Sequence, residues 1–157
     1  MDVTFRQATL DDLPVIVGLR DDLNVLERQA CSFALIQRMT VEQFADKWGH
    51  SFADPGHYWL LAESSGQALG YGLIYLIPKT KPLGAFVHWM YLSPLARGQG
   101  LGRKMFENLV SWARGRGARH IDLQYIEGNT SAAGFWKKMG FAEYARKCVK
   151  YLEDTAP

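Results

Sequence analysis

The chain has 157 residues, of which 48% are hydrophobic and 22% charged, and its formal net charge is +2 at pH 7. These values are typical of a globular domain and exclude a disordered or fibrous chain. A surplus of two positive charges is too small for a nucleic-acid-binding surface, which needs a dense basic face. We therefore expect a single domain over residues 1–157 that binds no nucleic acid.

The cysteine content and the hydropathy predict a cytoplasmic protein. Cys31 and Cys148 form no disulfide framework, which indicates a reducing compartment. Residues 1–12 are too acidic and too polar for a signal peptide. No apolar run approaches the roughly 18 residues that a membrane span needs. We expect a soluble chain without a membrane partner, and no metal site is expected.

The N-terminal part predicts a strand followed by a helix. Residues 3–8 alternate as a strand does, and Thr9 is placed as the N-cap of a helix that runs to about Leu23. Pro14 removes one backbone hydrogen bond near the start of this helix. Residues 24–39 have no clear period, so they either continue the helix or form a loop.

A second helix and a hairpin are expected next. Residues 40–43, Thr-Val-Glu-Gln, form a capping box, and the helix that they open ends near Trp48. Residues 58–63 and 68–77 have the composition of two strands, with a hairpin turn at residues 64–67 between them.

Residues 86–102 are the segment around which the chain is organised. Residues 86–92 form an aromatic and β-branched strand, which ends at Ser93-Pro94 because proline has no N–H to donate. The glycine loop, defined here as residues 97–102 (Arg-Gly-Gln-Gly-Leu-Gly), follows, and a helix begins there. The apolar positions of this helix recur at the spacing of one buried face: Leu101, Met105, Leu109 and Trp112/Ala113.

The C-terminal part predicts a strand over residues 120–126 and a short helix. Asn129 is placed to cap this helix, and Gly140 to end it at the C′ position. Residues 141–153 then read as one long strand or a tight pair of strands. The complete order, β-α-α-β-β-β-α-β-α-β(-β), predicts an α/β domain with a mixed sheet whose faces are covered by helices.

The glycine loop is suited to an anion. Glycine N–H groups converge without Cβ obstruction, and a helix N-terminus carries about half a positive charge. The dinucleotide pattern G-x-G-x-x-G is not present, and no Gly-Lys-Ser/Thr of a nucleotide P-loop occurs. The loop does fit Arg/Gln-x-x-Gly-x-Gly/Ala, with Arg97, Gly100 and Gly102 in register.

This signature resembles the pyrophosphate-binding loop of the GNAT superfamily of acyl-CoA-dependent N-acetyltransferases. Residues 129–141, Asn-x-x-Ala-x-x-Phe-Trp-x-x-x-Gly-Phe, are similar to that family's Asn-x-x-Ala-x-x-Phe-Tyr-x-x-x-Gly-Phe segment. The order of elements is also that of the GNAT fold, so the resemblance covers the whole chain. It implies a mixed, largely antiparallel sheet flanked by helices.

The resemblance implies acetyl-CoA as the co-substrate. The pyrophosphate would lie on the amides of residues 98–103, and the pantetheine arm along the backbone of Met90 and Leu92. The opening for it would lie between the strands at 86–92 and 120–126. The cofactor-binding residues implied in this way are Met90, Tyr91, Leu92, Arg97, Gly98, Gln99, Gly100, Leu101, Gly102, Arg103, Asn129, Ala132 and Trp136.

Transfer of an acetyl group to an amine needs a base or a relay for the amine's proton. The period of two places His88 on the same face of its strand as Met90 and Leu92, opposite Trp89. An imidazole titrates near neutrality, so His88 is the first candidate. Glu127, at the end of the next strand, is the second. The alternative for His88 is a strand histidine that only packs or bonds a carbonyl.

One residue departs from the family pattern, because Trp136 stands where many relatives have a tyrosine that protonates the departing thiolate. An indole N–H cannot supply a proton. Three interpretations stay open. Another hydroxyl, such as that of Tyr91 or Tyr144, is the acid; the thiolate leaves unassisted or takes a proton from water or the substrate; or activity is lost.

The expected function is transfer of an acetyl group from acetyl-CoA to a primary amine of a small molecule. Asp21, Asp22 and Glu27, together with many aromatic residues, hint at a cationic amine such as a polyamine, an aminoglycoside or an amino-acid derivative. A solvated helix face explains these acids equally well. The alternatives are acetylation of a protein N-terminus or lysine, and a catalytically silent acyl-CoA-binding module. The resemblance also leaves a homodimer open.

Overall fold

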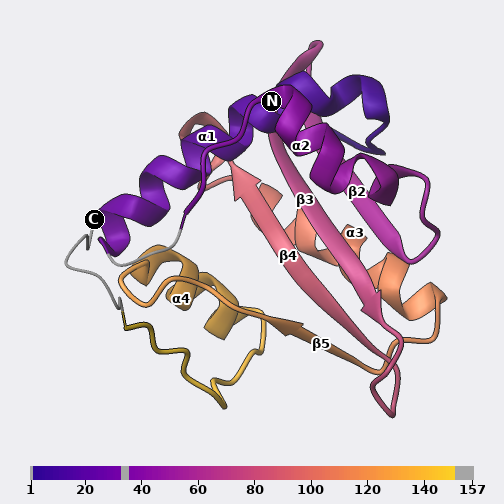
Figure 1. The fold of residues 1–157 in the computed structure, drawn as a ribbon, viewed down its shortest axis with the longest axis vertical. Coiled ribbons are helices and arrows are strands. Elements are labelled where there is room, and N and C mark those ends of the chain that lie inside the picture. Colours follow the sequence, from indigo (N-terminus) through magenta and orange to yellow (C-terminus); the bar gives the residue numbers. More distant parts are fainter. Residues whose placement is uncertain (1, 33–35, 151–157) are drawn as a thin grey trace. The chain divides into compact units, whose positions relative to one another are not determined.

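The computed structural model describes residues 2–32 and 36–150, and it contains a five-stranded sheet and four α-helices (Figure 1). The strands are β1 (Thr4–Gln7), β2 (His57–Ser64), β3 (Gln67–Ile77), β4 (Gly84–Leu92) and β5 (His120–Leu123). The helices are α1 (Leu13–Ala30), α2 (Val41–Trp48), α3 (Leu101–Gly115) and α4 (Thr130–Lys138). Short 3-10 turns occupy Leu10–Asp12, Gly49–Phe52 and Pro94–Ala96.

The chain divides into two compact units. The first comprises residues 1–21 and 39–124 and contains the whole sheet, α2 and α3. The second comprises residues 22–38 and 125–157 and contains α4 and the end of α1. The single domain expected from the chain length stays a prediction.

The sheet has the strand order β1-β2-β3-β4-β5, antiparallel from β1 to β4 and parallel between β4 and β5. The mixed sheet expected from the sequence is therefore confirmed. The β2–β3 hairpin turns through Ser65 (φ 50°) and Gly66 (φ 77°), both left-handed. A two-residue hairpin needs this geometry because it matches the twist of the strands.

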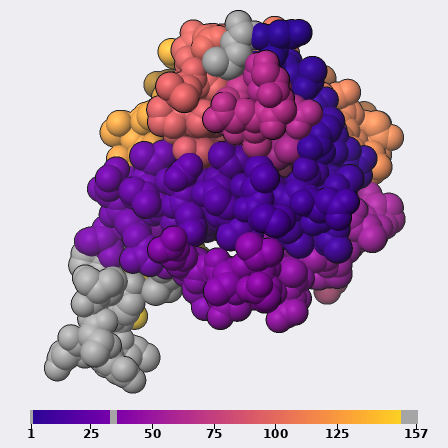
Figure 2. Space-filling model, turned by 90° about the horizontal axis from the view of Figure 1, so that it is seen from above, coloured from indigo at the N-terminus to yellow at the C-terminus, as the bar shows by residue number. Residues whose placement is uncertain are grey.

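Helices cover both faces of the sheet in the first unit. On one face, a Cβ added to Gly72 of β3 would meet Met105 and Leu109 of α3 at 3.3 Å, so the missing side chain lets α3 approach closely. On the other face, Phe44 of α2 contacts the ring of Trp59 at 6.0 Å. In Figure 2, seen from above, the start of α1 in indigo lies beside α2 in purple.

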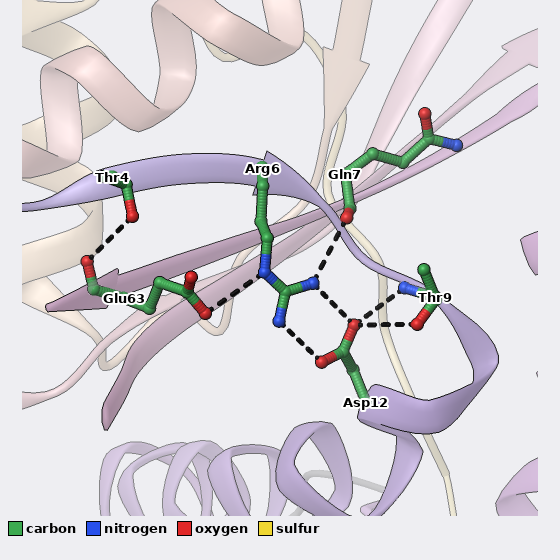
Figure 3. Close-up of polar contacts among 6 residues, drawn as sticks. All are labelled: Thr4, Arg6, Gln7, Thr9, Asp12 and Glu63. Atoms are coloured by element: carbon green, nitrogen blue, oxygen red, sulfur yellow. Dashed lines mark hydrogen bonds and ion pairs between the residues drawn. The ribbon is translucent and has the colours of Figure 1, made fainter. Parts of the chain in front are cut away.

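The start of α1 is fixed by a network around Arg6 (Figure 3). The Arg6 guanidinium donates to both carboxylate oxygens of Asp12 at 2.8 Å and to Glu63 at 3.1 Å. The Asp12 carboxylate in turn accepts from the backbone N–H of Thr9 at 2.8 Å. Thr9 thus opens a single 3-10 turn, and α1 begins at Leu13 with Pro14 in its first turn. The missing N–H of proline has no intrahelical partner to lose at that position.

Several helix boundaries expected from the sequence are confirmed. Thr40 caps α2 with a capping box: its hydroxyl accepts from the Gln43 N–H at 3.3 Å, and the Gln43 side chain accepts from the Thr40 N–H at 3.0 Å. The predicted buried face of α3 is buried at Leu101, Met105, Leu109 and Ala113. The open question about residues 24–39 is answered in part, because α1 continues past Leu23 to Ala30.

The strand expected at residues 141–153 is wrong over residues 141–150, which form neither helix nor strand and are exposed almost throughout. Residues 151–153 lie outside the described part of the chain. A strand cannot be predicted from its own segment alone, because its backbone N–H and C=O groups need a neighbouring strand to bond. Within the described residues, the helices are too short or too polar to cross a membrane.

Candidate functional site

One edge of β4 is paired with β5 over only the first half of the strand. Pairing with β5 runs from Gly84↔His120 to Val87↔Leu123, and no further among the described residues. On the other edge, β3 pairs with β4 as far as Leu92, and Ser93 N donates to Leu69 O at 2.8 Å. Because backbone groups alternate along a strand, those of Met90 and Leu92 point away from β3, toward the side that β5 has left.

His88 occupies a β-bulge at the point where β5 diverges. Leu73 of β3 pairs with Trp89 and Ile74 with Val87, so His88 has no partner residue in β3. A bulge adds one residue and resets the alternation of side chains. The prediction that His88 shares a face with Met90 and Leu92 is therefore wrong.

The contacts of the side chains confirm this assignment of faces. Met90 pairs with Gly72, which lies against α3, and Leu92 packs in the cluster of Leu69, Ala96 and Leu101. The rings of His88 and Trp89 instead both contact Trp48, the last residue of α2, with centroids at 4.8 and 4.9 Å.

The surroundings of His88 are aromatic and basic. Its ring lies 4.3 Å from Trp89, 4.8 Å from Trp48 and 5.9 Å from Tyr75, measured between ring centroids. The pKa of His88 is lowered to about 4, first by burial and then by the positive charges of Arg20, Lys47 and His57. The imidazole is therefore neutral at pH 7, which leaves a ring nitrogen able to accept a proton.

The glycine loop connects β4 to α3 and presents mainly its backbone. Gly98 and Gly100 have φ of 77° and 74°, left-handed values that favour glycine. The side chains between them fold back: Arg97 Nε donates to Leu92 O at 2.9 Å, and Gln99 Nε2 donates to Leu95 O at 3.3 Å. The Arg97 guanidinium also lies 5.8 Å from the centre of the Tyr91 ring.

The N-terminus of α3 has no side-chain cap. Its N-cap is Gly100, which has no side chain to accept from the first-turn N–H groups of residues 101–103, and these groups have no partner within a helix. The first turn contains no acid and carries Arg103 and Lys104. The buried side chains of Leu101 and Met105 anchor this turn on the sheet. The donor set therefore fits a phosphate or pyrophosphate anion.

In the second unit, Asn129 caps α4 as expected. Its Oδ1 accepts from the Ala132 N–H at 3.0 Å. The helix ends in a Schellman motif: Gly140 (φ 92°) donates to Lys137 O and Phe141 to Trp136 O, both at 3.1 Å. Trp136 is buried, with ring contacts to Phe135 at 4.8 Å and Phe141 at 5.5 Å.

The remaining candidates lie in very different surroundings. Glu127, in the second unit, has a side chain that is 89% exposed and lies 3.5 Å from the Arg146 guanidinium. Tyr144 is 83% exposed, whereas Tyr91 is buried in the first unit. Of the predicted residues, the first unit thus holds His88, residues 90–92 and the glycine loop with Arg103. Glu127, Asn129, Ala132 and Trp136 belong to the second unit.

Two residues around His88 were not among the predicted site residues. Arg20 of α1 lies over the Trp89 ring at 4.9 Å, and Trp48 of α2 contacts both His88 and Trp89. The only sequence signal for Trp48 was its place at the end of a predicted helix. Nothing local in the sequence joins Arg20 to residue 89.

Comparisons with known proteins agree with the fold. The profile of the Acetyltransferase (GNAT) family matches residues 21–141. The N-alpha-acetyltransferase RimI of Mycobacterium tuberculosis is 27% identical over 138 residues, which are 85% of this chain and 82% of that protein. The L-methionine sulfoximine/L-methionine sulfone acetyltransferase of Pseudomonas paraeruginosa is 28% identical over 149 residues, which are 90% and 81% of the two chains. A solved structure from Clostridium acetobutylicum, described as an acetyltransferase with acetyl-CoA, aligns with a TM-score of 0.76 at 21% identity and covers 96% of this chain and 97% of that one.

Proposed function

The chain belongs to the acetyltransferase (GNAT) family, and on that premise we propose that it transfers an acetyl group from acetyl-CoA to the primary amine of a small molecule. The observation that carries the proposal is the uncapped N-terminus of α3. It comes next along the chain after the end of β4, whose edge beyond Val87 has no partner strand among the described residues, and both lie in the first unit. An acetyl donor with a pyrophosphate and an amide-bearing arm needs both features: the helix N-terminus for the pyrophosphate and the strand edge for the amides of the arm.

The residues that would hold acetyl-CoA follow from their donor groups. The amides of residues 98–103 suit the pyrophosphate, and the backbone of Met90 and Leu92 suits the amides of the pantetheine arm. The Leu92 carbonyl already accepts from Arg97, so its N–H is the group left for the arm. We assign Asn129 and Ala132, at the start of α4, to the same arm by family likeness.

The reaction is direct transfer. When bound, acetyl-CoA supplies a thioester; the amine nitrogen forms a bond to its carbonyl carbon, the C–S bond breaks, and the amine loses one proton. Met90 N–H is the donor that we assign to the thioester carbonyl. His88, neutral at pH 7, accepts the amine's proton directly or through water. Glu127 is the second candidate for this proton.

No tyrosine stands at the family's acid position, where this chain has Trp136. The thiolate is therefore proposed to leave unassisted and to take its proton from water or from the substrate.

Two observations bear on the acceptor class. The relative from Pseudomonas paraeruginosa is named for small amino-acid-like substrates and covers most of this chain, which supports a small molecule. The relative named RimI, similar over 85% of this chain, supports a second candidate, acetylation of a protein N-terminus. A silent acyl-CoA-binding module is the third possibility, since the acid position carries Trp136.

Thiol release from acetyl-CoA, measured against a panel of small amines, amino acids and N-terminal peptides, distinguishes these functions. Calorimetric titration with acetyl-CoA runs beside it. The proposal expects micromolar or tighter binding and turnover with small amines above that with peptides. Binding without turnover on any acceptor would favour the silent module, and turnover on peptides alone would favour the protein N-terminal enzyme.

A further inference from the structure

Three polar side chains from three different elements meet around the ring of Trp89. The Arg20 guanidinium of α1 lies over this ring at 4.9 Å, the Trp48 ring of α2 lies 4.9 Å from it, and the His88 ring lies 4.3 Å from it. All of them belong to the first unit. The bulge in β4 creates this group, because it turns His88 and Trp89 to the same face.

The indole N–H of Trp48 lacks an acceptor among residues 2–32 and 36–150. Its Nε1 is buried and makes no hydrogen bond to any described residue. An indole N–H can only donate, and a buried donor without an acceptor costs roughly 1–3 kcal/mol. Native proteins rarely leave such a donor unsatisfied, so an oxygen from outside the chain is the expected partner.

The charges around His88 indicate what kind of oxygen this is. The three neighbouring groups that lower the pKa of His88, Arg20, Lys47 and His57, are all basic residues. A polyamine or an aminoglycoside would bring further positive charge to this place. A carboxylate would be attracted instead, and Arg20 can bind one without giving up another partner, because a guanidinium has five N–H donors.

We propose that the acceptor amine carries a carboxylate, which is bound on the α2 face of β4 by the Arg20 guanidinium and the Trp48 indole N–H. The partly exposed ring of Trp89 contacts the apolar part of the acceptor, and the buried ring of Phe44, 5.8 Å from it between centroids, supports it from behind. This inference rests on the proposed function and selects amino-acid derivatives among its small-molecule acceptors.

The carboxylate also affects the proton transfer. Part of the low pKa of His88 comes from the neighbouring cations. A bound carboxylate offsets their charge, which strengthens His88 as a base when an acceptor is in place.

The test compares leucine, methionine and phenylalanine with their carboxamides, in the full-length protein with saturating acetyl-CoA. Rates are expressed per concentration of neutral amine, because the amides have less basic amino groups. At least a tenfold higher kcat/KM is expected for each acid than for its amide. This ratio falls toward one in Arg20→Gln and in Trp48→Phe. Arg116→Gln is the matched control, since its guanidinium lies 4.4 Å over another indole, that of Trp112 on α3, and it should leave the ratio unchanged.

A second measurement needs no turnover and separates this inference from the proposed function. N-acetylleucine and N-acetylleucinamide are titrated calorimetrically into the protein with CoA present. Tighter binding of the acid that is lost in Arg20→Gln supports the carboxylate site even if no amine is acetylated. Equal affinities, or a preference for the amide in either assay, overturn the inference.

Discussion

The ring of His88 lies 4.3 Å from the ring of Trp89, although the two residues are neighbours in β4. In a regular strand, adjacent side chains point to opposite faces of the sheet. The bulge cancels that rule here and directs both rings at Trp48. The His88 side chain therefore lies on the face of the sheet that α2 covers, and not on the face that α3 covers, at the point where β5 diverges from β4.

If His88 takes the amine's proton, His88→Gln should keep its affinity for acetyl-CoA and lower turnover by about a hundredfold, the low end of general-base effects. The acid limb of kcat/KM in the unaltered protein should lie near pH 4, because the pKa of His88 is about 4, and not near 6.5 as for an ordinary imidazole. The rates are expressed per concentration of neutral amine, because the neutral fraction of the acceptor falls tenfold with each pH unit below the amine's own pKa. A variant with unchanged rate and profile would show that His88 only packs.

The same histidine should make stability depend on pH. A lowered pKa means that the unfolded chain binds a proton more readily than the folded one between pH 6.5 and 4. The contribution of the neutral ring is fully present above pH 6.5 and is lost as the pH falls to 4. In urea unfolding between pH 6.5 and 4, the His88→Gln variant should lose less free energy of unfolding than the unaltered protein. The expected difference is on the order of 2 kcal/mol, because the partly exposed ring is screened by solvent. Asp12, whose pKa is lowered to about 2, acts only below this window. Parallel curves for the two proteins would contradict the prediction.

Gly100→Asp should weaken acetyl-CoA binding at least tenfold, roughly 1.4 kcal/mol. The new carboxylate would stand at the N-cap of α3 and compete with the pyrophosphate for the same amides. Gly117→Asp is the matched control, because Gly117 also has a left-handed φ, 85°, and open space around it, but lies at the other end of α3. Calorimetric affinities of the two folded variants give the answer. Equal affinity of both variants for acetyl-CoA would show that the glycine loop does not bind the cofactor.

Asn129 has one role in the structure and a second one proposed. Asn129→Ala removes the acceptor for the Ala132 N–H and should cost about 1 kcal/mol of stability, whatever the cofactor does. Asn129→Ser keeps a capping oxygen and removes only the amide. If the amide bonds the cofactor arm, both variants raise KM for acetyl-CoA, while only the alanine variant lowers Tm clearly. A serine variant with unaltered KM would leave Asn129 as a helix cap alone.

The parts of the fold that the sequence predicted are those with local causes. The capping box at Thr40, the Asn129 cap and Gly140 at the end of α4 each act within one helical turn. The glycine loop and the buried face of α3 likewise depend on neighbouring residues. Such signals remain readable because no distant contact is needed to produce them.

The parts that the sequence did not predict depend on partners far along the chain. The bulge exists only because β3 offers no residue opposite His88, and a single strand cannot reveal that. The low pKa of His88 comes first from burial and then from Arg20 and Lys47, which two other helices bring to it. The segment at 141–150 was predicted as a strand, yet it has no neighbouring strand within the described residues.

The bulge also determines how β4 responds to changes in its length. Because Ile74↔Val87 and Leu73↔Trp89 are consecutive pairs in β3, β4 carries one residue more than its neighbour needs at this point. Deleting His88 would join Val87 to Trp89 in unbroken register and leave every other side chain of β4 on its present face. Deleting Phe86 would shift Gly84 and Ala85 against both β3 and β5 and turn them to the wrong faces. The sheet should therefore accept the loss of His88, as judged by an unaltered far-ultraviolet spectrum and a cooperative melt, and should not accept the loss of Phe86.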